Sequence, residues 1–209
     1  MEERRRHMVD QQLRRNGITD QRVLDAMSSV PREEFVPAAL REYAYVDRAL
    51  SIEAGQTISQ PLVVAAMTQA LDLKPSDHAL EVGAGSGYQA AVLAQLCRQV
   101  VTVEREPALA EHAAATLRRL GYDNVQVVAA DGASGYPALA PYPAILVAAA
   151  ARGVPPALIE QLAEGGRMAI PVEEPAGAEN QELRLYRKLR GDTRWEVLFP
   201  VRFVPLVTD

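Results

Sequence analysis

The chain has 209 residues, of which 48% are hydrophobic and 23% charged, a size and composition typical of one soluble domain that folds unaided. Its formal net charge of -5 supplies no basic field for nucleic acid or an anionic lipid surface, so we expect neither as a partner. The single cysteine, Cys97, excludes an internal disulfide, and the longest apolar run, residues 144–151, is far shorter than a membrane span. The lone cysteine fits a reducing cytoplasm, where we expect the protein, and we expect it to be a monomer.

The first part of the chain has the spacing of helices. Residues 2–40 carry apolar side chains at helical intervals, and "NGITD" at 16–20 breaks one helix and caps the next. A further helical pattern follows "TISQP" at 57–61 and ends before Lys74 and Pro75. Short helices are thus predicted ahead of the first strand of a sheet.

From residue 78 the chain alternates between short apolar runs and helical segments. Since each run is continuously apolar, strands covered on both faces are predicted, and the alternation indicates βαβ crossovers around a mostly parallel central sheet. The predicted strands are 78–83, 99–104, 125–130 and 144–149, and the helical segments between and after them are 88–97, 107–120 and 155–162.

The end of the chain changes character. Apolar residues in 183–189 and alternating ones in 195–203 flank Gly191 and Asp192, which predicts an antiparallel hairpin. Pro200 lacks a ladder donor, so an edge strand or a bulge is expected near it. We interpret "EEPAGAENQ" at 173–181 as a flexible loop.

The first predicted strand leads into the glycine turn "LEVGAGSGYQ", with Gly83, Gly85 and Gly87 ahead of a helix. Glycines let the backbone approach a ligand closely. A dinucleotide turn would need a sixth-position glycine where Tyr88 stands, so a nicotinamide cofactor is disfavoured. The form E-x-G-x-G-x-G, which begins at Glu81, suits a ligand without pyrophosphate, and S-adenosylmethionine is such a ligand.

Two further signals stand at the ends of the next strands. Glu104 ends the second strand and is placed to accept both hydroxyls of a ribose. Asp131 and Gly132 end the third, where the carboxylate can accept the exocyclic amine of adenine and the glycine leaves room for the ring. Because ligands bind at the carboxyl edge of open α/β sheets, these signals together predict a Rossmann-like methyltransferase fold that binds S-adenosylmethionine, with no metal.

Several stretches together resemble the protein-L-isoaspartate O-methyltransferase family over nearly the whole chain. The similarity is carried by the glycine turn and by "VPREEFVP" (30–37), "YAYVDRAL" (43–50), "GQTISQP" (55–61) and "VRFVPL" (201–206). It implies methyl transfer from S-adenosylmethionine to the free α-carboxylate of isoaspartyl residues in damaged proteins. The ester then closes to a succinimide, whose hydrolysis returns some normal aspartate.

The resemblance also implies the role of particular residues. Ser59 matches the position that the family treats as its active-site residue, and we assign it the orientation of the substrate carboxylate. Ile58, Ser59 and Arg105 join the residues named above as predicted cofactor contacts. Residues 43–54 and 204–206 are candidates for contact with the main chain of the substrate.

Ser59 has two other interpretations. A hydrolytic nucleophile needs a base within hydrogen-bond reach, and none of the histidines, His7, His78 and His112, stands in a suitable context, so we reject a Ser-His triad. A role in capping stays open, because Thr57 and Gln60 have the spacing of a capping box ahead of Pro61.

The chain departs from the usual family pattern at several positions, among them Pro143, Ala148 and Arg152, where aspartate, threonine and proline are common. Two alternative functions therefore stay open: a related carboxyl methyltransferase with a dedicated peptide substrate, and a module that binds the cofactor without catalysis. Within one domain, 1–209, we expect N-terminal helices with the substrate loop in 1–75, the cofactor-binding core in 76–172 and the C-terminal hairpin in 173–209.

Overall fold

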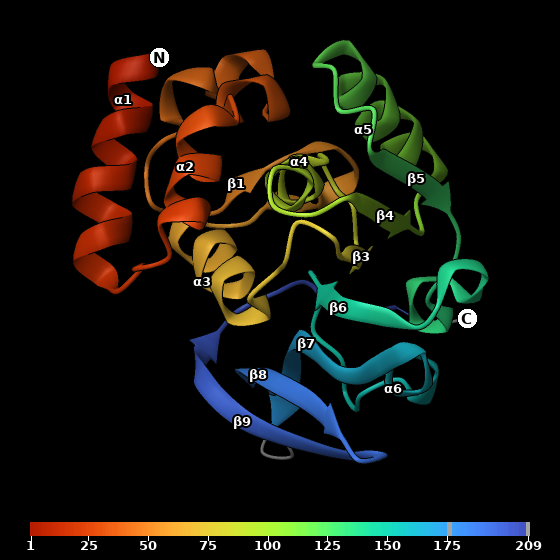
Figure 1. The fold of residues 1–209 in the computed structure, drawn as a ribbon. Coiled ribbons are helices and arrows are strands. Elements are labelled where there is room, and N and C mark those ends of the chain that lie inside the picture. The colour runs from red at the N-terminus through yellow and green to blue at the C-terminus, as the bar shows by residue number, and fades with distance from the viewer. Residues whose placement is uncertain (175–176, 208–209) are drawn as a thin grey trace.

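A computed structural model of the chain shows a seven-stranded sheet between layers of helices (Figure 1). It describes residues 1–174 and 177–207. The strand order is β5-β4-β3-β6-β7-β8-β9; neighbours from β5 to β7 are parallel, and β8 and β9 add to them antiparallel. The predicted mostly parallel sheet with an antiparallel C-terminal hairpin is confirmed.

The strands agree with the apolar runs of the sequence to within about two residues at most ends. The main sheet contains β3 (His78–Val82), β4 (Gln99–Glu104), β5 (Val125–Ala129), β6 (Tyr142–Val147), β7 (Leu162–Glu174), β8 (Gly177–Leu189) and β9 (Asp192–Val201), and β1 (Leu50–Ser51) with β2 (Thr57–Ile58) forms a separate antiparallel pair.

Helices occupy the predicted segments and several turns besides. The α-helices are α1 (Glu2–His7), α2 (Gln21–Ser29), α3 (Pro61–Leu71), α4 (Tyr88–Ala94), α5 (Pro107–Arg119) and α6 (Pro156–Gln161); η1 (Met8–Leu13) is a π-helix. The 3₁₀ helices are η2 (Arg14–Asn16), η3 (Arg32–Phe35), η4 (Ala38–Tyr43), η5 (Glu53–Gly55), η6 (Gly132–Ser134) and η7 (Pro137–Leu139).

The break predicted at residues 16–20 is confirmed. Gly17 ends the first helical run with φ of 92°, a left-handed conformation that glycine adopts at no steric cost. Asp20 then caps α2, because its side chain accepts a hydrogen bond of 2.9 Å from the backbone N–H of Arg22.

The core has two parts, one on each face of the sheet. Successive residues of a strand point to opposite faces, so Ala79 packs on the side of α2, α3 and α4, while Leu80 packs on the side of α6. The same alternation continues in β4 and β6, whose buried residues divide between the two parts. For this reason these strands carry apolar residues on both faces.

The C-terminal hairpin turns where the sequence predicts. Arg190 and Gly191 both have positive φ, 56° and 80°, and they connect β8 to the edge strand β9. The ladder between the two strands shifts register between Leu183 and Arg184, opposite Phe199 and Val197. The edge strand and the bulge expected near Pro200 are thereby confirmed.

The interpretation of residues 173–181 as a loop is wrong for the part that the structure describes. Strand β7 extends to Glu174 and β8 begins at Gly177, and the two pair antiparallel. The remaining residues of that segment, 175–176, lie outside the described chain. Strand β7 itself was not predicted, since Gly165, Gly166 and Pro171 are residues typical of loops.

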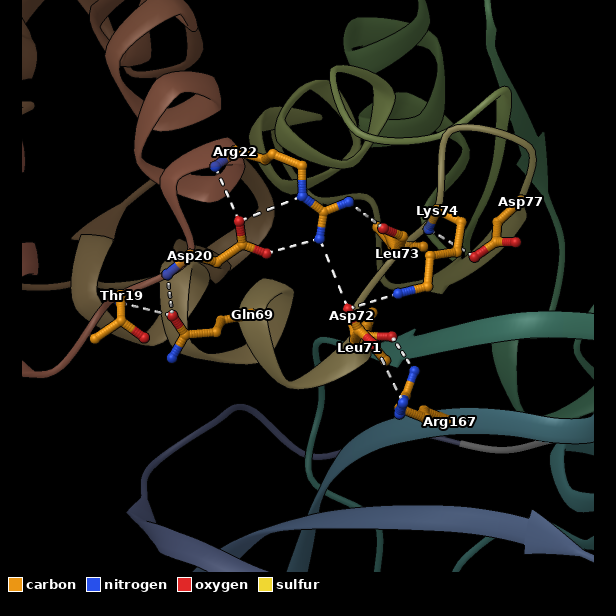
Figure 2. A network of polar contacts seen from close by, with 10 residues as sticks. All are labelled: Thr19, Asp20, Arg22, Gln69, Leu71, Asp72, Leu73, Lys74, Asp77 and Arg167. Atoms are coloured by element: carbon orange, nitrogen blue, oxygen red, sulfur yellow. Dashed lines mark hydrogen bonds and ion pairs between the residues drawn. The ribbon is translucent and has the colours of Figure 1, made fainter.

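A polar network connects the N-terminal helices, α3 and β7 (Figure 2). Asp72, which ends α3 with φ of 45°, forms ion pairs with Lys74 at 2.9 Å and Arg167 at 3.2 Å. Gln69 accepts the backbone N–H groups of Thr19 and Asp20 at 2.8 and 2.9 Å. The C-terminal end of α3 is thus attached both to the helical layer and to the sheet.

Candidate active site

Two neighbouring cavities lie at the carboxyl ends of the parallel strands. The first, which we call the sheet-edge cavity, has a volume of about 310 Å³, within the range of small-molecule sites. Its walls are the glycine turn after β3, the end of β4, the loop before α3 and the C-terminal segment. The lining residues are 56–59, Val64, 82–86, Tyr88, Gln89, 103–106, Gly132, Ala148, Ala149 and 204–207.

The second, the loop cavity, measures about 760 Å³ and is lined by Ala49, Val63, the loop before α3 and residues 200–204. The two cavities share a wall, because the same residues line both. These shared residues are Thr57, Ser59, Ala148 and Val204. Molecules in the two cavities would therefore both border this wall, to which Ser59 belongs.

The glycine turn brings backbone to the wall of the sheet-edge cavity at two positions. Gly83 and Gly85 line this cavity with positive φ of 93° and 50°, where a side chain would strain the backbone. Gly87 does not line it; its φ is 88°, it precedes α4, and a Cβ there would lie 3.2 Å from Leu117. The first two glycines fit a ligand that approaches the backbone, and the third serves helix packing.

Glu104 lies at the end of β4 with only 8% of its surface exposed. One carboxylate oxygen accepts the N–H of Gly85 at 2.8 Å, and the other accepts the N–H of Glu106 at 3.0 Å. A carboxylate offers about four lone-pair sites, so both oxygens can accept further hydroxyl groups. Glu104 thus orders the glycine turn and presents an acceptor pair to the cavity, as a ribose would require. Arg105, next in the chain, also lines this cavity.

Glu81 is placed differently from the other predicted cofactor residues. It is fully buried in β3 beside Thr102 of β4, and it does not line either cavity. Neither carboxyl oxygen has a hydrogen-bond partner among the described residues. Burial raises the pKa of Glu81 to about 8, which favours the neutral acid far more than in an exposed glutamate. Direct contact between Glu81 and the cofactor therefore has no support from its position.

Asp131 and Gly132 follow β5. Gly132 lines the sheet-edge cavity, and a Cβ on it would lie 2.4 Å from the side chain of Val82, so no larger residue fits without movement. Asp131 is half-buried and does not line that cavity; one oxygen accepts the N–H of Ala133 at 3.0 Å. The predicted contact of Asp131 with adenine stays a prediction.

Ile58 and Ser59 lie in and directly after β2, and both line the sheet-edge cavity. The predicted capping box of Thr57 and Gln60 is wrong, because α3 has no cap from either side chain. Thr57 is instead held in β2. Asp47, distant in sequence, accepts the N–H of Leu62 in the first turn at 3.0 Å and caps the helix.

Other predicted groups lie outside the site or on its edge. In the described part of the chain, no histidine lines either cavity, and no cluster of side chains suited to a metal ion occurs. Of the candidate segment 43–54, Ala49 alone lines the loop cavity, while residues 204–206 line the sheet-edge cavity. Thr57 lines both cavities, but the sequence did not indicate this. It lies in β2, a strand of two residues, which is too short to show an alternation of apolar and polar side chains.

Comparison with known proteins shows the family of this chain. Residues 3–209 match the family model described as protein-L-isoaspartate(D-aspartate) O-methyltransferase (PCMT). A protein-L-isoaspartate O-methyltransferase of Roseiflexus castenholzii is 55% identical, with 97% of this chain and 91% of that protein covered. One from Opitutus terrae is 52% identical, with 98% and 87% covered. The chain belongs to the protein-L-isoaspartate O-methyltransferase family.

Solved structures of the family share the fold. A protein-L-isoaspartate O-methyltransferase with 30% identity superposes with a TM-score of 0.87 over 100% of this chain and 66% of that one. A Plasmodium falciparum beta-aspartate methyltransferase, solved with S-adenosyl-L-homocysteine, has 28% identity and a TM-score of 0.84 over 98% and 99% of the two chains. The predicted family, fold and reaction class are therefore confirmed: the protein is a methyltransferase that uses S-adenosylmethionine. No helix among the described residues is long and apolar enough to span a membrane.

Proposed function

We propose that the protein methylates the free α-carboxylate of isoaspartyl residues, with the cofactor in the sheet-edge cavity and the substrate in the loop cavity. The observation that carries this proposal is the shared wall, where Ser59 faces both volumes. A hydroxyl at that junction can donate to a carboxylate on one side while the methyl donor lies on the other. The family match and relatives at about half identity support the substrate class.

The sheet-edge cavity fits S-adenosylmethionine. Gly83, Gly85 and Gly132 keep side chains away from the ligand, and Glu104 offers two oxygen acceptors at the end of β4. When bound, this cofactor supplies a methyl group on a sulfonium, whose C–S bond breaks as the new O–C bond forms. The chain holds the two reactants in line and excludes water, which can supply about 7 to 11 kcal/mol in favourable cases.

Ser59 acts by orientation rather than as a nucleophile or a base. A carboxylate has a reference pKa of about 4, so it is ionised at neutral pH and no proton needs to be removed. This agrees with the absence of histidine from the cavity walls of the described chain. The hydroxyl of Ser59 donates a hydrogen bond to one oxygen of the substrate carboxylate. The second carboxylate oxygen is then free to react with the methyl group.

The departures from the usual family pattern bear on the substrate side to different degrees. Ala148 lines both cavities, and it leaves more room at the shared wall than a threonine would. Pro143 lies within β6 and lines neither cavity. Arg152 is 93% exposed and pairs with Glu173 at 3.7 Å. We expect Ala148 alone among the three to affect substrate choice.

The protein acts as a monomer in the cytoplasm, and the methyl ester closes to a succinimide after release. The division into 1–75, 76–172 and 173–209 stays part of this proposal, with the substrate loop in the first part and the glycine turn in the second.

A paired-peptide assay tests the proposal. Purified protein is incubated with methyl-labelled S-adenosylmethionine and two peptides that differ only in an isoaspartyl or a normal aspartyl residue. Label on the isoaspartyl peptide alone is expected. Equal labelling or none would overturn the proposal. Binding of S-adenosylhomocysteine without turnover on either peptide would instead favour a dedicated peptide substrate or a catalytically silent module.

A further inference from the structure

Arg32 is a charged residue that the reaction does not use, and it is fully buried. It begins η3, within the stretch "VPREEFVP". Among the described residues no carboxylate lies within ion-pair distance of it; burial lowers its pKa, an effect that the charge of Asp47 partly offsets. Burial of an unpaired charge is costly, so this guanidinium must make contacts that a neutral side chain would not.

The contacts of Arg32 join segments that are far apart in the sequence. Its Nε donates to the carbonyl of Ala44 at 2.7 Å, and Nη2 donates to the carbonyl of Ser59 at 2.7 Å. The guanidinium carbon lies 4.7 Å from the ring centroid of Tyr88, at the start of α4. One planar group thus fixes the peptide of Ser59 relative to the helix that follows the glycine turn.

A second tether holds the other side of the same loop. Asp47 accepts the side-chain amide of Gln60 at 2.9 Å and the N–H of Leu62 at 3.0 Å. Arg32 therefore binds the carbonyl of Ser59 itself. Asp47 binds Gln60 and Leu62, which follow Ser59 in the chain. The stretches 30–37, 43–50 and 55–61 and the glycine turn each contribute a residue to this arrangement.

We infer that Arg32 is a positioning residue for the methyl transfer, which sets the place of the Ser59 hydroxyl on the wall between the two cavities. A guanidinium is suited to this task because its donors have fixed directions in one plane. Tyr88 lines the sheet-edge cavity, so the same group relates the serine to the cofactor side. The inference rests on the proposed function, in which Ser59 orients the substrate. It adds that Arg32 holds Ser59 in place.

The test is a double-mutant cycle with Arg32→Lys, Ser59→Ala and the double variant. Lysine keeps the charge but has no planar fork that can serve both carbonyls. Arg184→Lys is the matched control, because Arg184 also lies over an aromatic ring, Trp195, at 4.2 Å, and lines neither cavity. For each protein, kcat and KM on the isoaspartyl peptide are measured, together with hydrogen exchange at residues 57–62.

Arg32→Lys is expected to lower kcat by about tenfold to a hundredfold, since a misplacement of about 1 Å can have an effect of that size. In the Ser59→Ala background, where no hydroxyl needs to be placed, the same change is expected to alter kcat by less than about threefold. The backbone amides of residues 57–62 should exchange faster in Arg32→Lys than in the wild type. In Arg184→Lys their exchange rates should equal those of the wild type.

Additive losses in the cycle, or unchanged exchange at residues 57–62, would overturn the inference, since a purely structural arginine lowers activity regardless of Ser59. If Arg32→Lys does not fold, the cycle is run with Asp47→Asn, which loses the acceptor for Gln60, and the same non-additivity is expected. An inactive wild type would overturn the proposed function, and faster exchange in Arg32→Lys would still establish the loop anchor.

Discussion

Glu104 connects two turns that follow different strands of the sheet. Its oxygens accept the N–H groups of Gly85 and Glu106, so the turn after β3 and the turn after β4 share one carboxylate. Hydrogen bonds to a charged acceptor contribute about 1.5 to 3 kcal/mol each. The side chain thus shapes the sheet-edge cavity before any ligand enters it.

Glu104→Gln should weaken binding of S-adenosylhomocysteine by about tenfold to a hundredfold, because the amide nitrogen would face an N–H donor and one acceptor would be lost. Isothermal titration calorimetry measures the change. Glu111→Gln, an exposed glutamate on α5, is the control and should leave the affinity unchanged. Equal affinities for wild type and Glu104→Gln would show that this carboxylate does not contact the ligand.

Glu81 shows how burial acts on one group in the middle of a sheet. Its pKa rises from 4.5 to about 8 because the charged form is desolvated. The folded state then binds a proton that the unfolded state releases between these two values. Stability from this group is complete below pH 4.5 and falls as the pH rises toward 8.

Glu81→Gln should remove this part of the pH dependence, since an amide of the same shape does not titrate. The free energy of unfolding of the wild type should fall relative to that of Glu81→Gln as the pH rises from 5 to 8, by at most about 1.4 kcal/mol per pH unit. Urea denaturation at a series of pH values measures the difference. A constant difference across this range would mean that Glu81 is ionised throughout.

At the scale of elements, the sequence predicts those strands and turns whose positions follow from a local pattern of apolar residues or glycines. The strands β3 to β6 and the glycine turn have continuous apolar runs and spaced glycines, so they are readable without a structure. Strand β7 is not, because its glycines and Pro171 are accommodated only by pairing with β6 and β8. The cap of α3 by Asp47 and the anchor of Ser59 by Arg32 depend on contacts distant in sequence, and no local spacing reveals them.

Gly132→Ala tests how closely η6, the turn after β5, packs against the end of β3 at the cavity. The new methyl group would lie 2.4 Å from Cγ1 of Val82, so the free energy of unfolding should fall by about 1 to 3 kcal/mol. Gly153→Ala is the control, since a Cβ at that residue would have no neighbour within 4 Å and its φ is not in the left-handed region. Equal midpoints of denaturation for the two variants would contradict this packing.

At the scale of the whole molecule, α3 is fixed at both ends. Asp47 holds its first turn next to Ser59, and the network of Figure 2 attaches its last turn to the N-terminal helices and to β7. The helix has 11 residues, about 16 Å at the usual rise. The loop with Ser59 therefore has its position set by contacts at both ends of a rigid element.

Asp72→Asn should lower stability by less than about 1 kcal/mol at neutral pH, because the Asp72 side chain is 42% exposed and its ion pairs are screened. Asparagine tolerates the left-handed backbone at this position, so the change isolates the charge. The hydrogen bond from Lys74 holds the pKa of Asp72 below 3.8, so its stabilising effect is present above that pH and is lost as the pH falls through the lowered value. Thermal unfolding at pH 7 and at a series of pH values below 3.8 should show a difference that is largest at pH 7 and shrinks as the pH falls.

The shared wall of the two cavities also bears on synthesis of the protein. It takes Thr57 and Ser59 from β2 and the loop after it, Ala148 from the segment after β6 and Val204 from the segment after β9. Domains fold as they leave the ribosome, N-terminal parts first. A nascent chain that has not yet released β9 and residues 202–207 from the ribosome would lack one wall of both cavities, so newly made enzyme should become competent only after that segment has emerged.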